Sequence, residues 1–181
     1  MKRLAKILVP TDLSEHSRRA LLYGCWLAGE EKASLVVLYV ANEFSAWECY
    51  SEELTLIERN GKCWPADRVV AEATLDLNRY LEPSLASLKT PARATKRVVL
   101  GPIARQIAAI AAEEHADLVI MSPRRHHRGI RHLFFGAITD QVTRWSPCPV
   151  LSISPPLPSE PWRGRFAPIL FGWSRPREAN V

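Results

Sequence analysis

The sequence lacks the features that mark several protein classes. Its four cysteines, Cys25, Cys49, Cys63 and Cys148, form no CxxC pair and no disulfide framework. No apolar run approaches the length of a membrane span. The first ten residues carry too short an apolar run for a secretory signal, and Asp12 follows soon after. These absences predict a cytoplasmic chain with reduced thiols and no membrane partner.

The net charge and the number of glycines are also modest. The net charge of +5 is spread over 181 residues, which fits a soluble protein and does not by itself indicate nucleic acid. The sequence has eight glycines. A chain of this length suits one domain with a short extension. We therefore expect a domain over residues 1–154 and an extension over residues 155–181.

Short apolar runs alternate with segments of helical spacing. The runs, read as strands, cover residues 3–9, 33–40, 94–100, 117–121 and 149–154, and the helices begin near Ser14, Asp67, Pro102 and Ile138. Strands that are apolar throughout are typical of a parallel sheet covered on both faces. The pattern therefore predicts an α/β fold with a five-stranded parallel sheet. We interpret residues 41–65 as a long connection with a short helix near residues 52–58, and Pro83 as a kink or an early helix end.

The residues after Ser154 differ in composition. Four prolines, Pro155, Pro156, Pro158 and Pro161, predict a stiff and extended linker. Four aromatic residues follow them, namely Trp162, Phe166, Phe171 and Trp173, and such side chains are common anchors at interfaces. One hypothesis is therefore an adaptor whose tail docks on a partner or on a second subunit.

Several motifs resemble the universal stress protein family over residues 3 to 154. They are Lys6 to Ser14, Gly101-Pro102-Ile103, Ala116 to Met121, Gly136, and Ser146 to Leu151. The resemblance implies a Rossmann-like fold of the adenine nucleotide alpha hydrolase type. It also implies a homodimer through the fifth strand, with Val150, Leu151 and Ile153 at the interface. One branch of that family binds ATP through a loop of the form Gly-x-x-Gly, nine residues, then Gly-Ser or Gly-Thr. Another branch lacks these glycines.

The corresponding loop departs from the glycine pattern. Ser122 and Arg125 occupy the first two glycine positions, Pro123 removes a backbone donor, and Ala137 replaces the hydroxyl residue after Gly136. The segment is rich in basic side chains instead: Arg124, Arg125, Arg128, Arg131, His126, His127 and His132. Arginine binds phosphate bidentately, so an anion site built from side chains is one interpretation. A solvated basic connection is the other.

The candidate ligand residues are Pro10, Thr11, Asp12, Val40, Ser122, Arg124, Arg125, Arg128, Gly129, Gly136 and Ala137. The resemblance implies that Asp12 contacts the adenosine part of a nucleotide and that the backbone of Val40 faces adenine. Asp12 could equally close a turn, and Val40 could be core. The histidine spacing matches no metal site, so we predict none. The loop lacks interleaved aromatic residues, which argues against nucleic acid.

No nucleophile and base stand out as a pair, so we expect no conventional enzyme. The leading hypothesis is a dimeric, regulatory stress-response binding protein whose nucleotide loop is degenerate. An alternative is a switch that binds ATP and hydrolyses it weakly, because Asp12, Gly136 and the basic loop are present. No cofactor is assigned beyond ATP or AMP as a candidate ligand.

Overall fold

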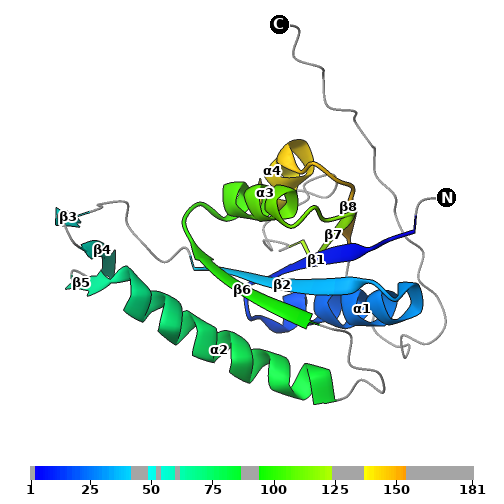
Figure 1. Ribbon diagram of the computed structural model, residues 1–181, viewed down its shortest axis with the longest axis horizontal. Coiled ribbons are helices and arrows are strands. Elements are labelled where there is room, and N and C mark those ends of the chain that lie inside the picture. The colour runs from blue at the N-terminus through cyan, green and yellow to red at the C-terminus, as the bar shows by residue number, and fades with distance from the viewer. Residues whose placement is uncertain are drawn as a thin grey trace, which may run out of the picture.

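The computed structural model describes residues 3–41, 49–51, 54–59, 62–86, 94–123 and 137–153 (Figure 1). The parallel sheet contains β1 (Lys6–Thr11), β2 (Ser34–Ala41), β6 (Ala94–Leu100), β7 (Leu118–Met121) and β8 (Val150–Ser152). The helices are α1 (Glu15–Glu31), α2 (Ala66–Ala86), α3 (Ile103–Glu113) and α4 (Ala137–Trp145). A second sheet contains β3 (Cys49–Ser51), β4 (Leu54–Arg59) and β5 (Lys62–Pro65).

The main sheet confirms the predicted fold class. Its five strands are all parallel and run in the order β6-β2-β1-β7-β8. The strand order reverses at β1, since the chain moves outward to β2 and β6 on one side and then returns to β7 and β8 on the other. In doubly wound sheets, ligands bind beyond the carboxyl ends of the strands at such a reversal. The topology therefore directs attention to the ends of β1 and β7.

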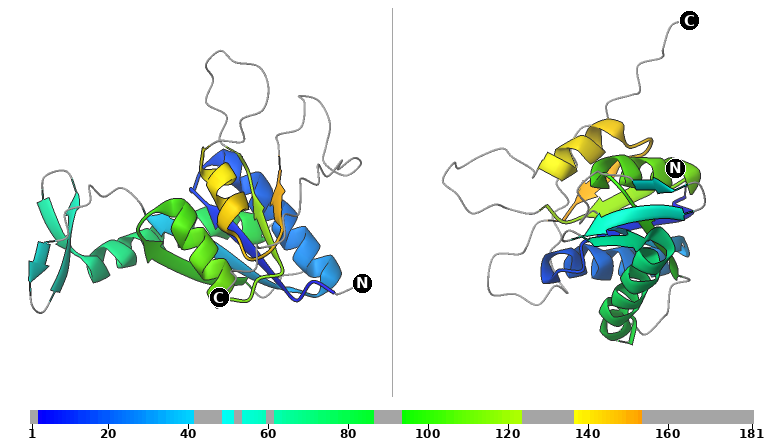
Figure 2. Two further views of the ribbon diagram at one scale, coloured as in Figure 1. Left: turned by 90° about the horizontal axis from the view of Figure 1, so that it is seen from above. Right: turned by 90° about the vertical axis from the view of Figure 1, so that its left-hand side faces the viewer.

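Alternate residues of each strand build two separate cores. On β1, Ile7 and Val9 pack beneath α1 and α2, whereas Leu8 packs against α3 and α4. All three side chains are fully buried. Figures 1 and 2 show the resulting three layers, with α1 and α2 on one face of the sheet and α3 and α4 on the other. This arrangement explains why the strands read as continuous apolar runs in the sequence.

The first helix follows the sequence signals closely. The helix begins near Ser14, as predicted; Ser14 is its N-cap, and the Ser14 Oγ accepts a hydrogen bond from the Ser17 backbone N–H at 3.3 Å. Gly24 faces the sheet, where an added Cβ would lie 2.6 Å from a methyl group of Val9. The absence of a side chain at Gly24 therefore lets α1 approach the strands closely.

The region between β2 and α2 contradicts the sequence interpretation. The helix expected near residues 52–58 is wrong, because β4 occupies Leu54–Arg59 and pairs antiparallel with β3 and β5. The missed signal is Asn60-Gly61, the dipeptide that most strongly favours a two-residue hairpin, between residues that pair as Arg59 with Lys62. This small sheet lies away from the main sheet, beside the start of α2 (Figures 1 and 2).

Pro83 does not end α2 early, since the helix continues to Ala86. Leu77, Tyr80 and Leu81 of the preceding turns are buried against the main core, and that packing holds the helix onto the sheet. Only a few residues of α2 follow Pro83. The proline therefore removes little helical structure apart from the hydrogen bond that its missing N–H cannot make. Within the described ranges, no helix is both long and apolar enough to cross a bilayer.

Candidate functional site

Three neighbouring strands bring several of the predicted ligand residues to one edge of the sheet. The β1–β2 register pairs Thr11 with Tyr39, and the β1–β7 register pairs Leu8 with Val119. Extended along the strands, these registers place Asp12 beside Val40 and Thr11 level with Ser122. Ala137 begins α4. The carboxyl ends of parallel strands thus gather residues that are far apart in the sequence.

The turn after β1 is held by buried hydroxyl groups. Thr11 is 7% exposed, and its Oγ1 accepts a hydrogen bond from the Leu13 backbone N–H at 3.1 Å. The same Oγ1 lies 2.9 Å from Oγ of Ser17. Leu13 has a φ of 60°, a left-handed conformation that is strained for a leucine. Thr11 therefore serves the turn, and its hydroxyl is already engaged within the protein.

Asp12 lies at the outer side of this turn. Its Oδ1 accepts hydrogen bonds from the backbone N–H and the hydroxyl of Ser14. Both interpretations offered by the sequence therefore retain a basis: Asp12 does close the turn, and its carboxylate is exposed at the ligand edge. A carboxylate repels phosphate, so a ligand here would place donors such as ribose hydroxyls or a base amino group near Asp12.

Tyr80 reaches this turn from α2, and sequence reasoning missed it. Its hydroxyl donates to the Ser14 carbonyl at 3.1 Å and lies 3.0 Å from Oγ of Ser17. The guanidinium of Arg18 stacks over its ring at 4.6 Å. Burial raises the pKa of Tyr80, which keeps the phenol protonated as a donor. Its spacing with Leu77 and Leu81 marks a core-facing tyrosine in the sequence, but only the packing of α2 on α1 reveals its partners.

Two serine hydroxyls near the carboxyl edge lack partners. Among the residues that the structure describes, Oγ of Ser122 and Oγ of Ser152 are buried without any hydrogen bond. A buried polar group that makes no hydrogen bond costs roughly 1–3 kcal/mol, and such groups often mark a place for a bound ligand, ion or water. Ser122 is one of the predicted site residues, whereas Ser152 was not.

The remaining predicted residues divide into two groups. Val40 is 7% exposed and packs in the core beneath α3 and α4. Its side chain is therefore a core residue, which is one of the two roles that the sequence allowed. Pro10 lies within β1, paired with Leu38. Arg124, Arg125, Arg128, Gly129 and Gly136 fall between the described ranges, as do the three histidines of the loop. The arginine side-chain site thus stays a prediction.

Two of the four cysteines, Cys25 and Cys148, have free thiols that are poorly suited to react. Burial raises the pKa of Cys25 to about 11, and burial also raises that of Cys148, so both thiols stay protonated near neutral pH. Within the same part, no group of three or more histidine, cysteine or acidic side chains is arranged to hold a metal ion.

Comparison with known proteins identifies the family. The family model described as the universal stress protein family matches residues 4–154. This chain belongs to the universal stress protein family. A universal stress protein of Methanocaldococcus jannaschii is 24% identical over 159 residues, which cover 83% of this chain and 82% of that protein. The resemblance noted in the sequence is therefore confirmed.

Solved structures of universal stress proteins share the fold. One, in complex with cAMP, superposes with a TM-score of 0.57 at 18% identity and covers 84% of this chain and 98% of its own. Another, from Archaeoglobus fulgidus in complex with dAMP, gives a TM-score of 0.53 at 14% identity, with 83% and 98% covered. At these identities the likeness shows the fold, which is the Rossmann-like architecture of the family.

Proposed function

We propose that this universal stress protein is a homodimeric regulatory binding protein that holds an adenine nucleotide at the carboxyl edge of β1 and β7. The observation that carries the proposal is the turn from Thr11 to Ser14. It sits at the reversal of strand order, keeps a left-handed Leu13, and presents the Asp12 carboxylate at the edge. The buried and unpartnered hydroxyl of Ser122 on the neighbouring strand supports the same location.

The nature of the ligand is supported by relatives and by chemistry. Two structurally similar universal stress proteins are described in complex with cAMP and with dAMP, which are adenine nucleotides. In this chain, Ser122 and Arg125 occupy two positions at which the phosphate-loop pattern has glycine. Phosphate contacts would therefore come from arginine side chains such as Arg124, Arg125 and Arg128, whose planar groups bind phosphate in a bidentate manner.

A regulatory role fits better than catalysis. The described residues around the turn are hydroxyls engaged with one another and one carboxylate that closes the turn, and none of them forms a nucleophile with an adjacent base. Ligand binding would instead order the edge of the sheet and report the nucleotide to a partner. A weakly hydrolysing ATP switch remains the second candidate, supported by Asp12, Gly136 and the basic loop.

Calorimetric titration of AMP, cAMP and ATP into the full-length protein tests the proposal. We expect saturable binding of at least one of them, together with a weaker response from an Arg125→Ala variant. Absence of heat with all three nucleotides at millimolar concentration would remove the nucleotide function. Release of inorganic phosphate from ATP, measured in parallel, separates the binding protein from the hydrolysing switch.

The dimer would form through β8, which is an edge strand paired only with β7 among the described strands. The backbone N–H of Val119 donates to the Pro149 carbonyl and that of Ile153 donates to the Met121 carbonyl, so residues 149 and 153 face β7. By alternation, the backbone groups of Val150 and Ser152 point outward to a partner. The Leu151 side chain is already buried in its own protomer, so it would hold β8 in position rather than contact the partner subunit.

A further inference from the structure

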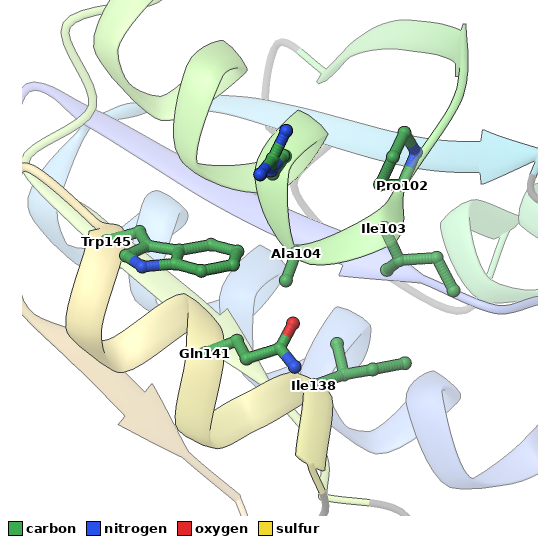
Figure 3. Close-up of a pocket in the computed structure, with 7 residues that line it drawn as sticks. Pro102, Ile103, Ala104, Ile138, Gln141 and Trp145 are labelled. Carbon is green, nitrogen blue, oxygen red and sulfur yellow. The ribbon is translucent and has the colours of Figure 1, made fainter.

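An apolar groove lies between α3 and α4, on the face of the sheet opposite α1. It has a volume of about 290 Å³ and is lined by Pro102, Ile103, Ala104, Arg105, Ile138, Gln141 and Trp145. Figure 3 shows Ile103 and Ile138 together toward one end and the Trp145 ring at the other. Ile138 is 39% exposed and Trp145 is 49% exposed. Large apolar side chains this exposed and this close together mark an interaction surface.

The size of the groove limits what can fill it. Sites for small organic ligands generally range from roughly 300 to 1,000 Å³ and bury most of the ligand. This groove is at the lower limit of that range, and its lining offers few polar groups beyond Gln141 and Arg105. One or two large apolar side chains from a peptide segment match it better than a polar metabolite does.

The path of the chain brings such a segment to the groove. Ile138 lies in the first turn of α4 after β7, Pro102 and Ile103 follow the end of β6, and Ile153 follows the end of β8. All three points lie at the carboxyl edge of the same parallel sheet. Residues 154–181 therefore start from the edge at which the groove opens. A proline-rich segment spans about 3.1 Å per residue, so the eight residues from Ser154 to Pro161 reach about 25 Å.

That reach exceeds the length of the helix that borders the groove. The nine residues of α4 extend about 13 Å at 1.5 Å per residue. Trp162, the first aromatic residue of the tail, can therefore lie anywhere along the groove. Proline residues before it restrict the backbone dihedral angles and so limit the entropy lost on docking.

The charges of the groove and of the tail are complementary as well. Arg105 lines the groove and has no salt bridge in the described part of the chain, whereas Arg144 and Arg97 each have an acidic partner. Glu160 stands two residues before Trp162 and is the first acidic residue of the tail. An ion pair between Glu160 and Arg105 would place Trp162 over the apolar floor formed by Ala104, Ile138 and Trp145.

We propose that the tail of this chain docks in cis on the α3–α4 groove, with Trp162 in the groove and Glu160 against Arg105. The tail is then an intramolecular cover of an apolar surface, and a partner that binds the groove must first displace it. This role uses the groove residues and neither Asp12 nor Ser122, so it does not depend on the proposed nucleotide binding.

Limited trypsin digestion of the full-length protein tests the docking, since Arg163 and Arg165 closely follow the proposed anchor Trp162 in the sequence. Mass spectrometry follows the loss of the tail at these two sites. We expect Trp145→Glu and Arg105→Glu each to raise the cleavage rate there about tenfold, because cleavage follows the population of the undocked tail. The double variant Arg105→Glu/Glu160→Arg should return toward the wild-type rate.

Leu75→Glu is the matched control, since Leu75 is an exposed apolar residue on α2, 56% exposed, away from the groove. It should leave the cleavage rate unchanged, and circular dichroism should show all variants folded. Equal cleavage rates in wild type, Trp145→Glu and Arg105→Glu would overturn the proposal. A wild-type rate that falls as protein concentration rises would overturn docking in cis in favour of a second copy of the chain.

Discussion

At the scale of single residues, the turn after β1 depends on hydroxyl groups that come from three different segments. Thr11 ends a strand, Ser17 lies in the first turn of α1, and Tyr80 belongs to the middle of α2. A single assignment of donors satisfies the group. The phenol of Tyr80 donates to the Ser14 carbonyl, Ser17 donates to the phenol oxygen of Tyr80, and Thr11 donates to Ser17. The network therefore ties α2 to the residues that position Asp12.

Tyr80→Phe tests this network. The change keeps the ring beneath Arg18 and removes only the hydroxyl, so the free energy of unfolding should fall by about 1 kcal/mol. Urea unfolding measures the loss. A double-mutant cycle with Ser17→Ala should then show coupling, because both changes break the same hydrogen bond. Strictly additive losses would mean that the two hydroxyls do not interact in solution.

The residues of the site were only partly visible in the sequence. Asp12 and Ser122 follow apolar runs, so their place at strand ends could be predicted from the sequence pattern. Tyr80 could not, because its contact with Ser14 and Ser17 depends on how α2 crosses α1 in space. Val40 was read as a ligand or a core residue, and its side chain proved to be core.

At the scale of elements, the order of strands and helices was predictable, while the small sheet was not. The central strands β1 and β2 are apolar on both faces, and this pattern can be recognised in the linear sequence. The strands β3, β4 and β5 pair with one another and lie beside the start of α2. They have no continuous apolar run that marks them as strands. Asn60-Gly61 is the local signal that would have identified the β4–β5 hairpin.

A charged cluster at the end of α3 joins that helix to two strands. Glu114 accepts hydrogen bonds from Lys6 at 2.9 Å and from Arg97 at 2.6 Å, and Arg97 also contacts Glu113 at 2.9 Å. The Glu114 side chain is 17% exposed. The hydrogen bond from Lys6 is the main cause that lowers the pKa of Glu114, and Arg97 lowers it further. The cluster therefore fastens α3 to β1 and β6.

The pH dependence of stability should report this cluster. The pKa of the Glu114 carboxyl is lower in the folded than in the unfolded state. The charged carboxylate therefore stabilises the fold above its unfolded pKa of about 4.5. That stabilisation is lost as the pH falls from there through the lower folded pKa. In Glu114→Gln, the loss of unfolding free energy between pH 6 and pH 3 should be smaller than in wild type by about 1 kcal/mol. Glu82→Gln is a control on α2, and identical pH profiles for all three proteins would contradict the assignment.

At the scale of the whole molecule, β8 forms one edge of the main sheet among the strands that the structure describes. Ser152→Pro should convert the expected dimer to a monomer, because proline removes an outward N–H that a partner strand would need. The pairing with β7 uses the N–H of Ile153 and should persist. Size-exclusion chromatography with light scattering measures the mass, and Ser152→Ala, which keeps the backbone donor, should stay dimeric. A wild-type monomer at micromolar concentration would refute the dimer itself.

The proposed nucleotide site does not depend on the glycine pattern of the loop alone. The reversal of strand order fixes the edge at which Asp12 and Ser122 meet, and this edge depends on the sheet rather than on glycine residues. The glycine pattern concerns only how phosphates are held. Serine and arginine at the glycine positions would therefore change how phosphate is held, and the proposed nucleoside end of the site would keep its place.

The most direct measurement is a calorimetric titration of AMP into wild type, Asp12→Asn and Asp76→Asn. The asparagine at residue 12 keeps the acceptor for the Ser14 backbone N–H but loses the charge that a nucleoside donor would meet. Asp76 is an exposed carboxylate on α2, so it is the matched control. We predict that Asp12→Asn weakens AMP binding by about tenfold or more, while Asp76→Asn binds like wild type. Equal affinities for all three proteins, or no binding by wild type at millimolar AMP, would contradict a nucleotide site at this edge.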